Sequence, residues 1–123
     1  MAGELVPLVL IPRYTTYSGT PTDDFTTIGL DVTQYSEAIV NVFLSDLVGT
    51  AGTVTMFFEE STDQNSWTEC TGTGPSGESL SENTEAQYTA TLAKRWFRVR
   101  VVLPNANNVA TLWATGFLER RLT

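Results

Sequence analysis

The chain has 123 residues, 41% of them hydrophobic, and its 14 acidic residues outnumber 7 basic ones, for a net charge of −7. This length corresponds to about one domain that can bury its own apolar core. The acidic balance argues against direct binding of nucleic acid, because contacts with phosphates need clustered cations. The apolar runs are too short to span a membrane, and no basic region of a secretory signal is visible. We expect the protein to stay where it is made.

The chain has no histidine and one cysteine. The missing histidine removes the commonest general base and the commonest transition-metal ligand, so we expect no catalysis and no bound cofactor. Cys70 cannot form an internal disulfide, which fits a reducing cytoplasm. Because no histidine is present to activate its thiol, we interpret Cys70 as a packing residue.

Residues 1–17 are predicted to form an edge strand or an extended N-terminal arm. Three apolar residues alternate along this segment: Val6, Leu8 and Leu10. Such alternation is typical of a strand with one apolar face, and Pro7 and Pro12 restrict it to the edge of a sheet. As an arm, the segment could add a strand to a neighbour's sheet. A turn at residues 18–21 would begin the main domain, residues 18–123.

The next strands are indicated by alternation and by continuous apolar runs. Residues 25–32 alternate in three apolar positions: Ile28, Leu30 and Val32. Residues 38–44 are apolar at nearly every position, which is typical of a central strand covered on both sides. A glycine-rich turn at residues 49–52 precedes the alternating strand 53–60, so residues 38–60 are predicted to form an antiparallel hairpin.

The second half of the chain repeats this pattern of short strands and turns. A turn at residues 63–66 precedes a short strand at 67–70, and residues 71–83 are predicted to be an exposed loop. Three more strands are predicted at residues 86–92, 96–103 and 110–118. The last two are joined by a turn of hairpin length at residues 104–108. Seven to eight strands without helical periodicity indicate an all-β, single-domain antiparallel β-sandwich, jelly-roll-like in form.

Acidic side chains offer only weak candidates for a chemical site. Glu59 with Glu69, or Asp63 with Glu60, lie close enough in sequence to converge, but a solvated surface is the favoured interpretation. The turn at Asp63 and the pair Asp23–Asp24 contain oxygen ligands suited to calcium. Neither segment has the spacing of a calcium loop, so a hydrogen-bonded turn is favoured over a metal site.

Two strands place aromatic residues where a sandwich normally has polar ones. Trp96, Arg98 and Arg100 share the face of strand 96–103 that lies opposite its apolar residues. Trp and Arg are enriched at interfaces, although the arginines could instead pair with local acids such as Glu85. Both alternatives remain open at this stage.

Strand 110–118 is apolar on both faces. Trp113 and Phe117 lie opposite four other apolar residues, Ala110, Leu112, Ala114 and Leu118. A second layer or a neighbouring subunit must therefore cover one of the two faces. With the N-terminal segment, these strands supply nine candidates for a partner interface: Leu5, Val6, Leu8, Leu10, Trp96, Arg98, Arg100, Trp113 and Phe117.

Residues 60–68, Glu-Ser-Thr-Asp-Gln-Asn-Ser-Trp-Thr, resemble the S-x-D-x-x-x-W hairpin of galactose-binding-like jelly rolls, including discoidin-type modules. Residues 95–99, Arg-Trp-Phe-Arg-Val, are similar to the R-Y-x-R-hydrophobic strand of the same families. The resemblance implies a jelly-roll fold. It also implies an alternative function, a carbohydrate-binding module in which Trp96 or Trp113 stacks on a sugar and loops around Asp63 or Asp23 hold calcium or hydroxyl groups.

The E-S-T-D-x-x-x-W pattern in a short, acidic, threonine-rich chain also resembles small structural proteins of tailed bacteriophages. Some of these are capsid decoration (cement) proteins, which are β-rich, often trimeric, and reinforce the shell. The resemblance implies a non-enzymatic virion component, assembled in the host cytoplasm, that binds the major capsid protein or another virion protein and copies of itself. A trimer is one expected form, and a tail, baseplate or head-fibre position stays open.

Overall fold

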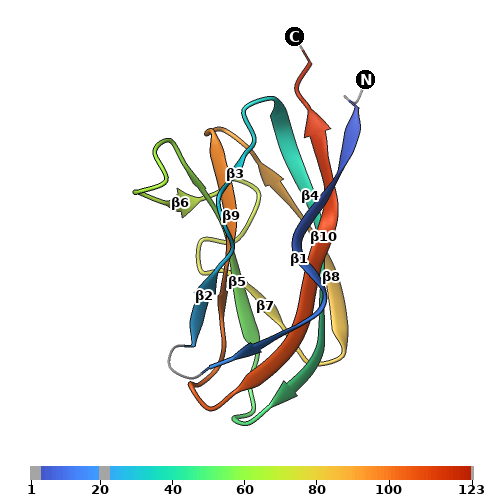
Figure 1. Cartoon of the computed structure of the whole chain (residues 1–123), viewed down its shortest axis with the longest axis vertical. Helices are drawn as coiled ribbons and strands as arrows, with labels where there is room; N and C mark the ends of the chain where they lie inside the picture. Colours follow the sequence, from blue (N-terminus) through green and yellow to red (C-terminus); the bar gives the residue numbers. More distant parts are fainter. Residues whose placement is uncertain (1–3, 20–22, 123) are drawn as a thin grey trace.

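A computed structural model describes residues 4–19 and 23–122, and their regular secondary structure consists of β-strands in two packed antiparallel sheets (Figure 1). The all-β sandwich predicted from the sequence is confirmed. Within these residues, no helix has the length and apolar character needed to cross a membrane. The first three residues of the predicted arm, and residues 20 and 21 of the turn at 18–21, lie outside the described residues.

Sheet A contains four long strands in the order β1-β10-β4-β8. Their bounds are Leu5–Ser18 for β1, Val109–Arg120 for β10, Tyr35–Val48 for β4 and Thr84–Thr91 for β8. Strand β4 is therefore central, as predicted, but in the described residues only one of its faces is buried, so the predicted cover on both sides is not found. Strand β1 pairs antiparallel with β10, with two register shifts. Of the two forms predicted for the N-terminal segment, the described part is an edge strand of the chain's own sheet.

Sheet B is built around two adjacent strands, β9 (Trp96–Val102) and β5 (Val54–Ser61). On the far side of β9 lie β2 (Asp24–Thr26) and β3 (Leu30–Asp31). On the far side of β5 lie β6 (Thr68–Glu69) and β7 (Glu78–Leu80). Each outer position of sheet B is thus filled by two short strands that follow one another along the chain.

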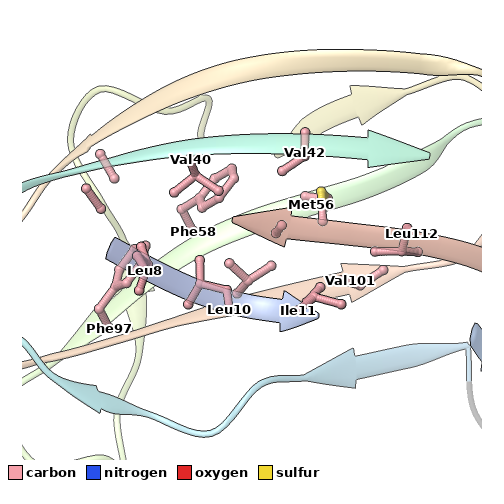
Figure 2. Close-up of a cluster of buried hydrophobic side chains, with 14 of the residues drawn as sticks. Leu8, Leu10, Ile11, Val40, Val42, Met56, Phe58, Phe97, Val101 and Leu112 are labelled. Atoms are coloured by element: carbon pink, nitrogen blue, oxygen red, sulfur yellow. The ribbon is translucent and has the colours of Figure 1, made fainter. Parts of the chain in front are cut away.

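The core lies between the two sheets, where inward-facing side chains from both layers interdigitate (Figure 2). The alternation read from the sequence identifies these residues correctly. In β9 and β5 the predicted inward residues are all buried: Phe97, Val99, Val101, Val54, Met56 and Phe58. Sheet A contributes Leu8, Leu10 and Ile11 from β1, four alternating residues of β4 and four residues of β10: Ala38, Val40, Val42, Leu44, Ala110, Leu112, Ala114 and Leu118. Burial of these side chains is the main stabilising contribution to the fold.

The two long hairpins predicted from turn signals are wrong. Strand β4 belongs to sheet A and β5 to sheet B, so the turn at residues 49–52 lies in a connection that crosses from one sheet to the other. The turn at residues 104–108 likewise connects β9 of sheet B to β10 of sheet A. A hairpin within one sheet and a connection between the two sheets both direct the same alternating residues toward the core. Local alternation therefore cannot distinguish the two kinds of connection.

Two further predictions need correction, which raises the number of strand segments to ten in the described residues. The predicted loop at residues 71–83 contains β7, whose Leu80 is only 3% exposed and belongs to the core. The predicted strand at residues 25–32 divides into β2 and β3, and Ile28 between them is 85% exposed. At this break the Thr27 hydroxyl accepts the Val99 N–H at 3.0 Å, so a side chain replaces part of the strand ladder.

Candidate functional site

The outer face of sheet A is unusually apolar for a surface that no other part of the described chain covers. Cross-strand register aligns Pro7, Phe117 and Ile39 in one row and Trp113 with Phe43 in another. We call this surface the sheet A face and define it by eight residues: Leu5, Pro7, Val9, Ile39, Phe43, Trp113, Phe117 and Tyr14. Val9 is 59% exposed and Phe117 is 42% exposed. The row between these two is polar and pairs Thr115 with Asn41, so the apolar side chains form two neighbouring patches. Exposed apolar patches of this kind often mark a surface that contacts a partner.

Three aromatic rings form the centre of the sheet A face. The Trp113 ring lies 4.7 Å from that of Phe43 and 4.9 Å from that of Tyr14, measured between centroids. Because β1 and β4 flank β10 on opposite sides, these neighbours enclose the indole from both sides. The Arg13 guanidinium adds a weaker cation–π contact, 6.0 Å from the Trp113 centroid. The trio is thus held by its own packing and presents its outer edge to solvent.

Tyr14 is held in a conformation that non-glycine residues rarely adopt. Its φ angle is 62°, and it lies in the register shift between Ile11 and Thr15 of β1. Tyr14 is also 69% exposed, so burial of the residue does not explain this conformation. Backbone strain of this kind persists only where surrounding contacts maintain it, and bulges of this type often redirect a side chain at a functional position.

The sheet A face also has an acidic border. Glu119 and Glu37 are paired beyond the Phe117 row, and Glu85 lies beside Phe43 on β8. A partner that covers the apolar rows would meet these carboxylates at its rim. Complementary contacts there need basic or hydrogen-bond-donating groups on the partner.

The predicted interface residues of the N-terminal segment divide between the two faces of β1. Leu8 and Leu10 are buried in the core, so the prediction that they contact a partner is wrong. Val6 is half-buried, and Leu5 and Val9 are exposed. The alternation was read correctly, but the apolar set that it identified packs within the chain's own sandwich.

On the outer face of sheet B, the predicted arginine face is neutralised by internal ion pairs. Arg98 Nε lies 2.9 Å from Glu59 Oε1, and Arg100 Nε lies 3.3 Å from Glu59 Oε2. Arg100 also contacts Asp24 at 3.2 Å. The interpretation that local acids pair with the arginines therefore holds, with Glu59 and Asp24 in the role suggested for Glu85. These ion pairs offset the charge of both arginines within the chain.

The aromatic rings on sheet B lie against these same cations. The Arg98 guanidinium lies 4.1 Å from the Trp67 centroid, and that of Arg100 lies 4.0 Å from the Phe57 centroid. Trp96 is half-buried, and the Arg95 guanidinium lies 4.9 Å from its centroid. The tryptophan rings on this side thus pack against arginines, which makes Trp96 a poor platform for an external ring.

Glu59 and Glu69 are neighbours across β5 and β6. The solvated surface favoured for these acidic residues is wrong for Glu59 and Glu60, which are only 7% and 5% exposed. Burial, with a smaller effect from the Glu59 charge, raises the pKa of Glu69 above its usual value. Its Oε2 atom is buried without a hydrogen-bond partner. Glu60 lies on the other side of β5 and accepts hydrogen bonds from the backbone N–H groups of Ala93 and Lys94. Glu59 is bound by two arginines, so Glu69 is the member of the pair that keeps a carboxylate oxygen without a hydrogen-bond partner.

The turn around Asp63 is the hydrogen-bonded turn that the sequence favoured. Asp63 Oδ1 accepts the N–H groups of Asn65 and Ser66 at 2.9 and 3.0 Å and the Ser61 hydroxyl at 3.0 Å. These bonds lower the pKa of Asp63. In residues 4–19 and 23–122, no cluster of three or more His, Cys, Asp or Glu side chains is placed to hold a metal ion. Asp24 contacts Arg100, and Asp23 belongs to no such cluster.

Cys70 is buried next to β5, with its N–H donated to the Phe58 carbonyl at 2.8 Å. Burial is the main cause that raises the pKa of its thiol well above the usual value. A thiol in this state is a poor nucleophile and a poor metal ligand. The interpretation of Cys70 as a packing residue is confirmed.

Two of the open hollows on the surface of the described residues are large enough to consider. One, of about 330 Å³, lies between β1 and the β2–β3 segment, and residues such as Val9, Tyr17 and Ile28 line it. The other, of about 350 Å³, is lined in part by Arg120 and Arg121. Arg120 contacts Glu4 at 3.0 Å, and Arg121 donates to a backbone carbonyl, so intramolecular contacts already engage both guanidinium groups. Neither hollow brings reactive groups together.

Sequence reasoning missed Tyr14 and Phe43 as parts of the candidate surface. Phe43 could have been found, because it alternates with the buried residues Val42 and Leu44. Tyr14 could not, because the two register shifts in β1 break the alternation before it. No family model matches the chain, and no curated protein matches it significantly.

Proposed function

We propose that this chain is a non-enzymatic structural protein of a phage virion, a decoration protein that binds the major capsid protein and copies of itself. The observation that supports it is the sheet A face, an exposed apolar surface with an ordered aromatic centre. Its position in a virion rests on the resemblance of residues 60–68 and of the chain's composition to small phage structural proteins.

An apolar surface of this kind is unfavourable when it is exposed to water. Burial of apolar area contributes about 25 cal/mol per Å² of favourable free energy, and aromatic side chains supply much of that area at interfaces. Trp113 is already fixed between two rings, so little side-chain entropy is lost when a partner packs over it. A flat, rigid and apolar sheet face suits permanent assembly better than transient binding of a small ligand.

We infer further that the sandwich is a jelly roll. If β2 with β3 and β6 with β7 each count as one strand, eight strands form two sheets of four, in the orders β1-β10-β4-β8 and β2/β3-β9-β5-β6/β7. Two Greek keys would produce this arrangement, and jelly rolls are frequent in viral capsid and lectin domains. The topology is compatible with both functions considered from the sequence.

The test is incorporation into particles. Virions of the phage that encodes the chain would be purified after complementation with wild-type chain, Phe117→Glu or the control Thr26→Glu, which adds the same charge to an exposed position of sheet B. We expect mass spectrometry to find the wild type and Thr26→Glu in particles and to find Phe117→Glu reduced at least tenfold, equivalent to about 1.4 kcal/mol. Crosslinks from Lys94, the only lysine, should reach another chain. Particles without the wild-type chain would refute the proposal.

A carbohydrate-binding module is the second candidate, and the exposed Tyr14 ring favours it. Trp96 and Trp113 are both packed against neighbours, which leaves Tyr14 as the most exposed aromatic ring of the trio. A glycan array with the isolated chain, repeated with and without calcium, would test this function. Sugar binding that Tyr14→Ala abolishes would favour the module over the virion component.

A further inference from the structure

The two edges of sheet A differ in how well they are protected against pairing with another strand. Arg120 N–H donates to the Glu4 carbonyl at 2.7 Å. At the start of β1, the backbone N–H and C=O groups of even-numbered residues therefore point toward β10, and those of odd-numbered residues point away from the sheet. Pro7 occupies an outward position and has no N–H to offer. Pro12 and two register shifts disrupt the rest of this edge. These are the devices by which proteins prevent strand addition, so β1 is a poor site for it.

The opposite edge, formed by β8, has few of these devices. Strand β8 pairs with β4 from Glu37↔Thr91 to Leu44↔Thr84 without a register shift, and it contains neither proline nor lysine. An exposed, regular edge of this kind is a template for another strand. Its protecting features are the charge of Glu85 and the bridge from Thr71 to Thr91, which covers the end of the strand.

The hydrogen bonds at the end of β8 define which backbone groups face outward. Leu92 N–H donates to the Ser36 carbonyl at 2.9 Å, toward β4, whereas Thr91 N–H donates away from β4 to the Thr71 carbonyl at 2.8 Å. By alternation, the backbone groups of Glu85 and Gln87 also point away from β4. In the described part of the chain, β8 is the last strand on that side of sheet A.

We propose that β8 pairs with β8 of a second copy of this chain, antiparallel about a two-fold axis, so that the two A sheets become one continuous sheet. Thr71 bridges Thr91, and a Cβ added at Gly72 would lie 2.7 Å from the Thr89 carbonyl oxygen, so residues 71 and 72 occupy this part of the edge. The pairing is therefore limited to the first part of the strand. The register is therefore centred on Ala86. This inference goes beyond the proposed function and does not depend on it.

Charge and size complementarity favour a second copy as the occupant. In this register Glu85 lies opposite Gln87 of the second copy, so a carboxylate meets an amide donor and the two Glu85 side chains avoid direct opposition. Ala86 meets its own equivalent on the inner side, where a small side chain fits. The interface is isologous, as in most homodimers. The two sheet A faces would then lie side by side and form one larger apolar surface.

The first test uses hydrogen exchange of the full wild-type chain, followed by NMR at increasing protein concentration. In the monomer the outward amides of Glu85 and Gln87 face solvent and should exchange fast, and in the dimer they should become at least tenfold slower. The amide of Tyr88 faces β4 and should be protected at every concentration, which provides an internal control. Fast exchange of Glu85 and Gln87 at all concentrations up to about 1 mM, where weak complexes still form, would overturn the proposal.

The second test measures dimer affinity by sedimentation equilibrium for two variants at one position. Gln87→Pro removes an N–H that makes no bond in the monomer, so the fold should survive while the dimer dissociation constant rises at least tenfold. Gln87→Ala keeps the N–H and loses only the side-chain amide opposite Glu85, so the constant should rise less than in Gln87→Pro. A dimer that withstands Gln87→Pro would contradict pairing through β8. If Gln87→Pro fails to fold, the exchange experiment on the wild type still decides.

Discussion

Gly116 provides the most direct test of how β10 and β4 pack in sheet A. It lies opposite Leu8 on one side and Val40 on the other, in the middle of the sheet. A Cβ atom at this position would overlap the carbonyl oxygen of Ile39 and would lie 2.9 Å from the carbonyl carbon and 3.1 Å from the Val40 Cα. The obstacles are backbone atoms, so no side-chain rotation can relieve the overlap.

The Gly116→Ala substitution should therefore be strongly destabilising. Two carbon atoms reach their best separation at about 3.5–4.0 Å, so β10 and β4 would have to move apart by roughly 1 Å at their centre. Overpacking of this kind costs about 1–3 kcal/mol, and each weakened ladder hydrogen bond adds about 1 kcal/mol. We expect a loss of about 3 kcal/mol in the free energy of unfolding, from a total of about 5–15 kcal/mol. The melting temperature should fall by about 10 °C.

Urea denaturation followed by tryptophan fluorescence measures this loss. Gly74→Ala is the matched control, because a Cβ there lies 3.2 Å from the Glu78 carboxylate, the end of a flexible side chain, and 3.2 Å from the Gly77 carbonyl. The control should lose less than about 1 kcal/mol. If Gly116→Ala were as stable as Gly74→Ala, the close approach of β10 to β4 would be refuted.

Three further predictions concern sheet B and β7. Glu59→Gln removes the carboxylate shared by Arg98 and Arg100, whose side chains are only 21% and 27% exposed. Urea denaturation should show a loss of about 2 kcal/mol in the free energy of unfolding. An unchanged denaturation midpoint would refute this ion-pair network. Leu80→Ala should cost about 2–4 kcal/mol in the same assay, whereas a loop residue would cost under about 0.5 kcal/mol. The raised pKa of Glu69 means that protonation favours the folded state, so its contribution to stability falls as pH rises through that pKa. Glu69→Gln should gain stability relative to the wild type from about pH 4 to about pH 7, and parallel curves would contradict this.

Part of the candidate site was predictable because alternation alone decides which face of a strand a residue occupies. Trp113 and Phe117 lie on the outer face of β10, as predicted, while Ala110, Leu112 and Ala114 are fully buried on the other face. Whether the outer face of β10 is also buried could not be predicted, because that depends on which other parts of the molecule pack over the sheet. The outer aromatic cluster needed Tyr14 from β1 and Phe43 from β4, which are far apart in sequence.

The arginine face shows where sequence reasoning stopped. The residues on the outer side of β9 were identified, but their partners were not. Arg98 pairs with Glu59, which is 39 residues away, because β5 and β9 are neighbours in sheet B. No local pattern encodes that adjacency. Choosing Glu85 as a nearby acid failed because β8 belongs to the other sheet.

The sequence by itself determined that the chain is an all-β sandwich and which residues of its long strands face the core. Hydropathy with a period of two is a local property, and it is read correctly in β5, β9 and β10. Only the tertiary structure decided which strands pair. A turn after β4 is compatible with a hairpin or with a crossing to the other sheet, and contacts between distant residues select one of them. That selection formed the sheet A face, neutralised the arginine face and placed β8 at an open edge.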